Sequence, residues 1–389
     1  MYFVADCLRM SCFLATKALM QSMSAGVKAR VSFQQAYRTK KADVQQLEKS
    51  LKEQYARVQE YASELRRVDS DTTVEIKCDF NNLDKALIFK RMYICLSALK
   101  MGFRSGCRPI LGVDGCHLKS AYGGQLLSAV GLDANNTTYV VAYAIVEQDS
   151  KDSWLWFLRL LQNDLNSTGE GNGFTFISNK QKGLLPACEE VLPLLDQVLY
   201  LAQPLRNPKH WSRAHFNTFL KCDVFLKNLC ESFNAFILPA RSKPVISSFE
   251  EITVKLMKRI ALRKEKMRKV VDPICPKPRE ILEKNKVKST TDCISSGIGS
   301  PKIEAESIGG DRYLVELQRR SCACRRWDLT GIPCKHACSA INFMREQPDA
   351  YVDACYLTKT YMDIYSHTVK RVNGMDLWMP SKEPAILSP

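Results

Sequence analysis

Three cysteines and a histidine lie close together near the C-terminal end of the sequence, in the run Cys322 to His336, CACRRWDLTGIPCKH. Cys322 and Cys324 form one pair, and Cys334 and His336 form a second pair after nine intervening residues. Thiolate sulfur and imidazole nitrogen are the ligands of structural Zn²⁺ sites, and four of them complete a tetrahedral shell. The spacing therefore predicts a structural zinc site that closes the loop between the pairs. The alternative is a chance cluster, because the chain holds 16 cysteines.

The residues on either side of this run fit a zinc-binding module. Residues 313–317 alternate like a strand and lead in, and residues 337–341 lead out as an apolar helix. With these flanks, the CxC…CxH pattern resembles the SWIM-type zinc finger. Cys338 is a further thiol one helical turn after Cys334. It is either a replacement ligand or a small packed hydrophobe, and the second interpretation is favoured.

The middle of the chain predicts an α/β domain. In chain order its patterns predict strands over 109–114, 125–132 and 138–146, a helix over 153–165, a strand over 173–179 and a helix over 180–192. This order predicts an RNase H-like core, in which helices flank a mixed sheet. In such a core the first and fourth strands lie side by side, so we expect the residues that end them to converge.

Two polar residues end those neighbouring strands. Asp114 is the last residue of the first strand, and Asn179 stands at the matching place on the fourth. Phosphodiester exchange with two metal ions requires carboxylates from different strands at one point, and Mg²⁺ or Mn²⁺ would fill such a site. An amide such as Asn179 removes one negative charge and cannot bridge two metals. An ordinary turn carboxylate is the alternative role for Asp114.

Longer motifs around these residues follow one another in a recognisable order. They are GVDGCHLK at 112–119, YGGQLL at 122–127, KDSW at 151–154, FISNKQKG at 176–183, HWSRA at 210–214, CESFN at 230–234 and ARSKP at 240–244. Together with the zinc finger they resemble a plant Mutator-like element (MULE) transposase, over roughly residues 50 to 380.

The resemblance implies a triad of two aspartates and one glutamate that binds the divalent metals. Asp114 matches its first residue and Glu231 its third, whereas Asn179 stands where the family has the second aspartate. The helical insertion that the family carries between Leu185 and Trp211 is also shortened here. The resemblance thus implies DDE-type transposase ancestry with a degenerate, and by expectation inactive, catalytic triad. A surface carboxylate is the alternative role for Glu231.

Composition and charge limit the class of protein further. The chain of 389 residues is 46% hydrophobic with a net charge of +15, and no run of 18 apolar residues predicts a membrane span. Between Ile252 and Thr290 it holds thirteen Lys/Arg against four Asp/Glu. A clustered basic excess favours a nucleic-acid partner, here DNA, although a solvated helix face is the alternative. Arg259 and Arg263 belong to this basic run, on a helix predicted over 249–270.

These observations predict five regions. They are a mainly helical N-terminal region at 1–100, the transposase core at 101–246, a basic helix and linker at 247–305, the SWIM-type finger at 306–345 and a tail at 346–389. Within them, Ser289 to Gly310 is expected to be a Ser/Gly-rich linker. We expect the aromatic residues of the tail to pack against the finger rather than read bases: Tyr351, Tyr356, Tyr361, Tyr365 and Trp378.

The predicted function is that of a transposase-derived, zinc-binding and DNA-binding nuclear protein whose catalysis is impaired. One alternative is an active metal-dependent transposase that cleaves and transfers strands. A second alternative is a zinc-stabilised protein-interaction module, with a homo-oligomer or another protein bound through the finger.

Overall fold

The computed structural model describes residues 20–21, 24, 32–81, 86–166, 174–178, 183–191, 198–200, 218–222, 227–297 and 302–389. Asn179 lies outside these residues. Within the described ranges, no helix is both long enough and apolar enough to span a membrane.

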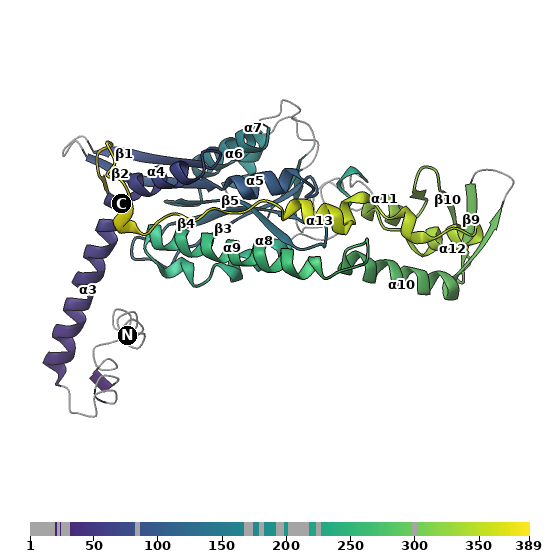
Figure 1. The fold of residues 1–389 in the computed structure, drawn as a ribbon, viewed down its shortest axis with the longest axis horizontal. Helices are drawn as coiled ribbons and strands as arrows, with labels where there is room; N and C mark the ends of the chain where they lie inside the picture. The colour runs from purple at the N-terminus through teal and green to yellow at the C-terminus, as the bar shows by residue number, and fades with distance from the viewer. Residues whose placement is uncertain are drawn as a thin grey trace.

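A mixed sheet forms the centre of the molecule (Figure 1). Its strands are β1 (Thr73–Asn81), β2 (Ala86–Cys95), β3 (Ile110–His117), β4 (Gln125–Leu132), β5 (Thr138–Val146), β6 (Thr175–Ser178), β7 (Val198–Tyr200) and β12 (Ile386–Leu387). They lie in the order β1-β2-β5-β4-β3-β6-β7, with β12 beside β2. β3 and β6 run parallel, with Val113 opposite Ser178, so the predicted adjacency of the first and fourth core strands is confirmed.

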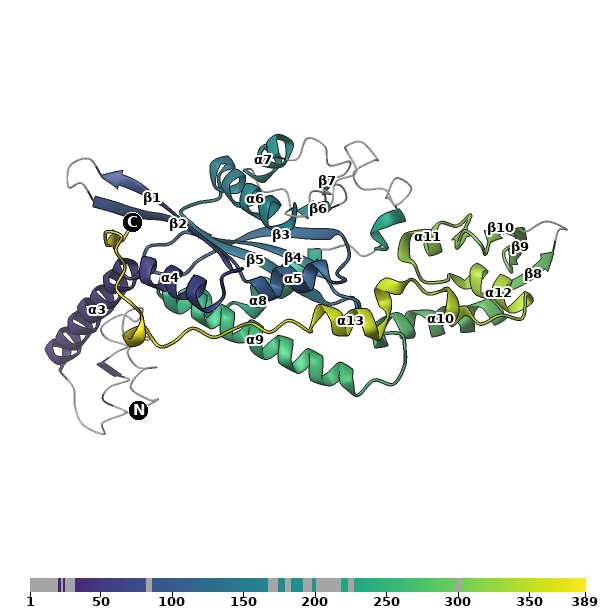
Figure 2. The same cartoon turned by 45° about the horizontal axis from the view of Figure 1, so that its top comes forward.

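Helices cover both faces of this sheet (Figure 2). They are α4 (Val58–Val68), α5 (Ser97–Arg104), α6 (Lys151–Asn166), α7 (Leu184–Val191), α8 (Lys227–Phe236) and α9 (Val245–Arg268), whereas α3 (Phe33–Ala56) extends away from the sheet (Figure 1). β4 and β5 are buried along their whole length, which explains their nearly continuous apolar sequence. On one face Tyr93 of β2 packs on Phe157 of α6, and on the other Tyr143 of β5 packs on Phe249 of α9. The predicted fold class, an α/β protein with a helix-flanked mixed sheet, is confirmed.

A second, smaller module lies at one end of the molecule (Figure 1). It contains α10 (Pro276–Asp292), β8 (Cys293–Gly297), β9 (Lys302–Ser307), β10 (Arg312–Glu316), β11 (Ser321–Cys322), α11 (Arg326–Thr330) and α12 (Lys335–Phe343). Its strands form a separate sheet in the order β11-β10-β9-β8. The expected linker at 289–310 is therefore wrong: within its described residues the chain ends one helix and forms two paired strands.

The tail of the chain returns to the core. After the 3₁₀ helices η5 (Pro348–Tyr351) and η6 (Ala354–Tyr356), α13 (Thr358–Ile364) packs against α9 and α5. Tyr365 contacts Tyr139 of β5, and Trp378 contacts Tyr61 of α4, so the expectation that these tail aromatics pack on the finger is wrong. Tyr351 does pack there, against Trp327. The apolar core around the central sheet is larger than that of the zinc module, and Tyr365 and Trp378 pack against it.

Candidate metal sites

The predicted zinc ligands come together in the second module. One ligand atom from each of Cys322, Cys324, Cys334 and His336 lies within 4.8 Å of the others. The Cys324 and Cys334 sulfurs are 3.5 Å apart, and Cys322 Sγ is 3.8 Å from His336 Nδ1. Zn–S bonds of about 2.3 Å in a tetrahedron separate two sulfurs by about 3.8 Å. The four side chains therefore fit a zinc ion.

Local structure explains how each ligand pair is formed. Cys322 ends β11, and the Arg325 N–H donates to the Cys322 carbonyl at 2.7 Å, which closes a turn that contains Cys324. Cys334 is the N-cap of α12, and its sulfur accepts the Ala337 N–H at 3.5 Å. His336 follows in the first turn of that helix. A β-turn and a helix N-terminus thus present two ligands each, as the paired spacing predicts.

The close packing of the three thiols perturbs their acidity. Hydrogen bonds from Cys322 and Cys334 hold the pKa of Cys324 well below its usual value. The same contact with Cys324 raises the pKa of Cys322 well above its usual value. Without a cation, one thiolate is stabilised at the expense of its neighbours. A divalent metal removes this conflict, because metal binding releases the protons of all ligating thiols.

Two residues outside the ligand set orient His336. Ser307 Oγ lies 3.1 Å from His336 Nε2, and the Tyr313 ring stacks on the imidazole at 4.1 Å. Because Nδ1 faces Cys322, the arrangement assigns the proton to Nε2, which donates it to Ser307, and leaves Nδ1 to bind metal. Sequence reasoning missed Ser307, because it lies in the segment expected to be a linker.

Ser307→Ala is expected to weaken zinc binding about 10- to 100-fold, because the imidazole loses the acceptor that fixes its tautomer. Competition with a chromogenic chelator measures the affinity. Ser296→Ala is a matched control, since Ser296 is exposed on the neighbouring strand β8. Equal zinc affinities for Ser307→Ala and the wild type would contradict this role.

Cys338 is not part of the zinc-ligand cluster. It is fully buried, and its thiol points to the Pro333 carbonyl at 3.7 Å. It packs with Ile274, Leu282 and Tyr356 in a small apolar cluster. The interpretation of Cys338 as a packed hydrophobe is confirmed.

The predicted carboxylates lie where α8 packs on β3. The expected strand end at Asp114 is wrong, because β3 continues to His117 through its pairing with β4. Gly112 allows close approach, because a Cβ there would lie 3.0 Å from Cys230 Sγ. One helical turn further along, Asn234 Nδ2 donates to Asp114 Oδ2 at 2.8 Å. Glu231 lies on the same helix, is exposed, and acts electrostatically on Asp114. The structure therefore brings Asp114 and Glu231 near each other.

Burial dominates the electrostatics of Asp114. The side chain is 6% exposed, and this burial raises its pKa above the usual value. Hydrogen bonds from Asn234 and from the Gly115 N–H counteract the rise in pKa, whereas the negative charges of Glu231 and Asp149 add to it. A cation at this point would relieve that repulsion.

Asn234 and Asp149 are residues that sequence reasoning missed. Asp149 lies between β5 and α6, and its Oδ1 accepts the Trp154 Nε1–H at 2.6 Å. A carboxylate just after a buried strand was the available signal. Among the described residues, however, Asp114, Asp149 and Glu231 do not form a group close enough to share one metal ion; the Cys/His cluster does.

The helix-flanked sheet thus carries a buried carboxylate on β3, and the second module carries a Cys/His cluster that fits a zinc ion. The family model described as the MULE transposase domain matches residues 110–199. The model of the SWIM zinc finger matches residues 313–343. The predicted resemblance to a MULE transposase with a C-terminal SWIM finger is confirmed over these residues, and its plant origin stays a prediction. A search of curated proteins finds no match to the chain.

Proposed function

We propose that this protein is a transposase-derived, nuclear DNA-binding protein. Its zinc finger stabilises it, and it no longer cleaves DNA. The residues found at the expected acidic positions support the proposal. Asp114 is hydrogen-bonded to the amide Asn234, and the sequence has Asn179 at the second acidic position. Two divalent cations bring four positive charges, so a missing bridging carboxylate leaves much of that charge without compensation.

By the resemblance, the sequence has the amide Asn179 where a two-metal site needs an anionic oxygen. An amide oxygen can ligate one Mg²⁺ or Mn²⁺ ion but cannot bridge a pair. Asp149 is the residue that favours the alternative of an active enzyme, because it is a third carboxylate that acts on Asp114. However, its Oδ1 accepts the Trp154 Nε1–H, and it does not lie close enough to Asp114 and Glu231 to share a metal ion with them, which supports the inactive assignment.

Strand cleavage is the direct test of inactivity. With terminal-inverted-repeat DNA and Mg²⁺ or Mn²⁺, we expect the wild type to give no more product than Asp114→Ala. Cleavage by the wild type that disappears in Asp114→Ala and in Asp149→Asn would establish an active metal site and overturn the inactive assignment. Cys334→Ser serves as a separate control that disturbs only the zinc module.

Exposed lysines on α9 and on the turn after it support DNA binding. Lys258, Lys266 and Lys269 are exposed, and among the described residues they have no carboxylate within ion-pair distance. Arg259 and Arg263 behave differently, since both donate to the Thr138 carbonyl of the core. Burial, and then the charge of Arg263, lowers the pKa of Arg259 to about 10. Neither the solvated-face nor the DNA-contact interpretation holds for these two arginines, which hold α9 to the sheet.

A salt series measures the contribution of the lysines. Duplex DNA binding, followed by fluorescence anisotropy, should weaken as salt rises. Replacing Lys258, Lys266 and Lys269 by Gln should reduce the slope of log affinity against log salt by about 2–3, since each phosphate contact contributes about 0.9. Replacing the exposed Lys49, Lys52 and Lys382 by Gln is the matched control. Absence of binding at low salt would leave the protein-interaction module as the favoured function.

A further inference from the structure

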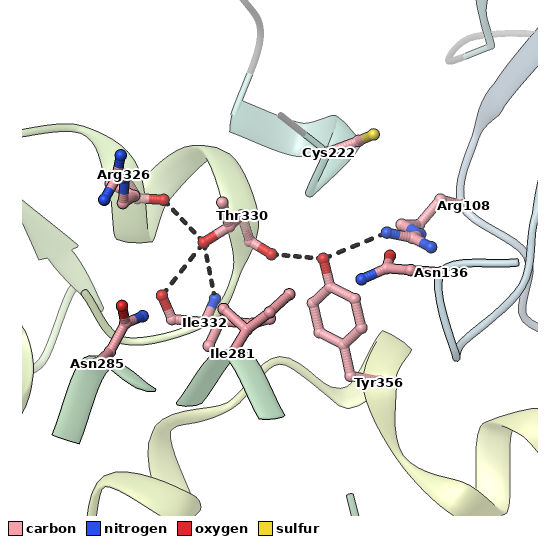
Figure 3. A pocket seen from close by; sticks show the side chains of 9 residues that line it. All are labelled: Arg108, Asn136, Cys222, Ile281, Asn285, Arg326, Thr330, Ile332 and Tyr356. Carbon is pink, nitrogen blue, oxygen red and sulfur yellow. Dashed lines mark hydrogen bonds between the residues drawn. The ribbon is translucent and has the colours of Figure 1, made fainter. Parts of the chain in front are cut away.

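A partly enclosed cavity lies where the sheet domain meets the zinc module (Figure 3). Its volume is about 170 Å³, well above the roughly 10–15 Å³ that one water requires. The core contributes Arg108 and Asn136, α10 contributes Asn285, α11 contributes Arg326, and η6 contributes Tyr356. The cavity is thus built from elements on both sides of the joint, and the described residues that line it include two arginines and no carboxylate.

Arg108 is the unusual residue of this cavity. It is 3% exposed, and its protein partners are neutral acceptors. Nη2 donates to the Asp133 carbonyl at 2.7 Å, and Nη1 donates to the Tyr356 hydroxyl at 3.2 Å and the Lys221 carbonyl at 3.4 Å. Nε is buried and has no hydrogen-bond partner in the described part of the chain. No described carboxylate lies within ion-pair distance of this guanidinium.

A buried charge without a counter-charge is normally destabilising, and one unused donor adds to the cost. Asp133 is a carboxylate that acts electrostatically on Arg108, but it is occupied by Thr137, Tyr365 and Arg263. An anion in the cavity would satisfy both requirements, because it would supply the missing charge and accept from Nε. Arginine is well suited to this role, since its planar fork matches the oxygens of carboxylate and phosphate.

The other lining groups agree with an oxyanion. Arg326 is exposed and, within the described residues, makes no ion pair, so its side chain can turn toward a ligand. Asn136 Oδ1 is buried without a described partner. Rotation of this terminal amide would present its NH₂ group to an anion. Asn285 already uses Nδ2 to bind the Pro333 carbonyl at 2.8 Å, so it fixes the wall and is not assigned to the ligand.

We propose that this cavity is a binding site for a phosphate group, held by Arg108 and Arg326 at the joint between the sheet domain and the zinc module. A phosphate there joins residues of both parts, so its binding stabilises their association. The phosphate comes either from a free phosphate or phosphomonoester or from the backbone of a nucleic acid. The proposal is independent of the proposed DNA-binding function, because the free ligand alone suffices for it.

The test uses the full-length, zinc-loaded protein. Calorimetric titration with sodium phosphate, at an ionic strength held constant with NaCl, should show saturable binding at one site. Arg326→Ala should weaken it about tenfold, as expected for loss of one charge-assisted hydrogen bond. Arg319→Ala is the matched control, because Arg319 is an exposed arginine of the same module outside the cavity and should leave binding unchanged.

Arg108→Lys provides a second variant that keeps the buried charge but removes the Nε donor, and it should also weaken phosphate binding about tenfold. Its unfolding temperature, measured with and without phosphate, separates this loss from misfolding, because a folded variant that lost the ligand gains no phosphate-dependent stabilisation. Non-saturable phosphate binding, or equal binding by Arg326→Ala and the wild type, overturns the proposal.

A competition experiment identifies the source of the phosphate. Displacement of bound phosphate by a short DNA duplex, with a larger loss of DNA affinity in Arg326→Ala than in Arg319→Ala, assigns the site to the nucleic-acid backbone. Simultaneous binding of phosphate and duplex assigns it to a free phosphate. Both results support the site, and failure of the lysine variants to change DNA binding has no bearing on it.

Discussion

Cys334→Ser is expected to abolish zinc binding and to unfold the zinc module. Cys334 is 1% exposed, supplies one of the four ligand side chains, and caps α12. A structural zinc ion contributes an apparent free energy of about 10–16 kcal/mol to small zinc-finger domains. The module has a small apolar core around Trp327 and Ile341, and such a core stabilises a domain of this size only marginally. Loss of the ion therefore removes most of the stability of the module.

Zinc content and circular dichroism measure this effect. The purified wild type should hold about one zinc ion per chain, and Cys334→Ser close to none after dialysis against a weak chelator. Cys338→Ala is the matched control, since Cys338 is equally buried and adjacent but lies outside the ligand cluster. It should lose some packing free energy and keep its zinc. Full zinc content in Cys334→Ser would exclude this ligand set.

The zinc ligands and the central strands could be predicted from sequence because their signals are local. The ligand pairs lie within one turn each, and α12 begins beside the second pair. The predicted strands at 125–132 and 138–146 coincide with β4 and β5. Both strands are buried on both faces, so their apolar runs are continuous and end at the Asp133–Asn136 turn.

The segment at 289–310 could not be predicted in this way. Its serines, threonines and glycines are typical of a linker, and each strand is short. β8 is stabilised by pairing with β9, and β9 by pairing with both β8 and β10, while Ser295 of β8 also bonds Ser339 of α12. Strand propensity depends on such partners, which a single-sequence pattern does not contain.

The roles of Arg259 and Arg263 could not be predicted from the sequence either. A run of lysines and arginines on a helix predicts a solvated or DNA-binding face, and the exposed lysines fit that pattern. The two arginines instead reach Thr138, more than a hundred residues earlier in the chain. The buried Asp133 beside that strand is the counter-charge that draws Arg263 inward. The pairing of Arg263 with Asp133 therefore cannot be recognised without the fold.

Asp133→Ala is accordingly expected to destabilise the protein by about 3–5 kcal/mol, because it leaves the positive charge of Arg263 without its partner. Asp133 is 0% exposed. Its Oδ1 accepts the N–H groups of Asn135 and Thr137 at 3.0 and 2.8 Å, which fixes the β4–β5 turn. Its Oδ2 accepts the Tyr365 hydroxyl at 2.8 Å and lies 3.6 Å from Arg263 Nη1. One carboxylate thus links a turn of the sheet, α9 and the returning tail.

Urea unfolding followed by tryptophan fluorescence measures the loss, since Trp154 is buried in the core. Asp311→Ala is the matched control: Asp311 is exposed in a turn, so its replacement should change the free energy of unfolding by less than about 0.5 kcal/mol. A double replacement of Asp133 by Ala and Arg263 by Met should recover part of the loss, because it removes the unpaired charge. If the free energy of unfolding of Asp133→Ala lay within about 1 kcal/mol of the wild-type value, the carboxylate would not be the group that holds α9 and the tail to the sheet.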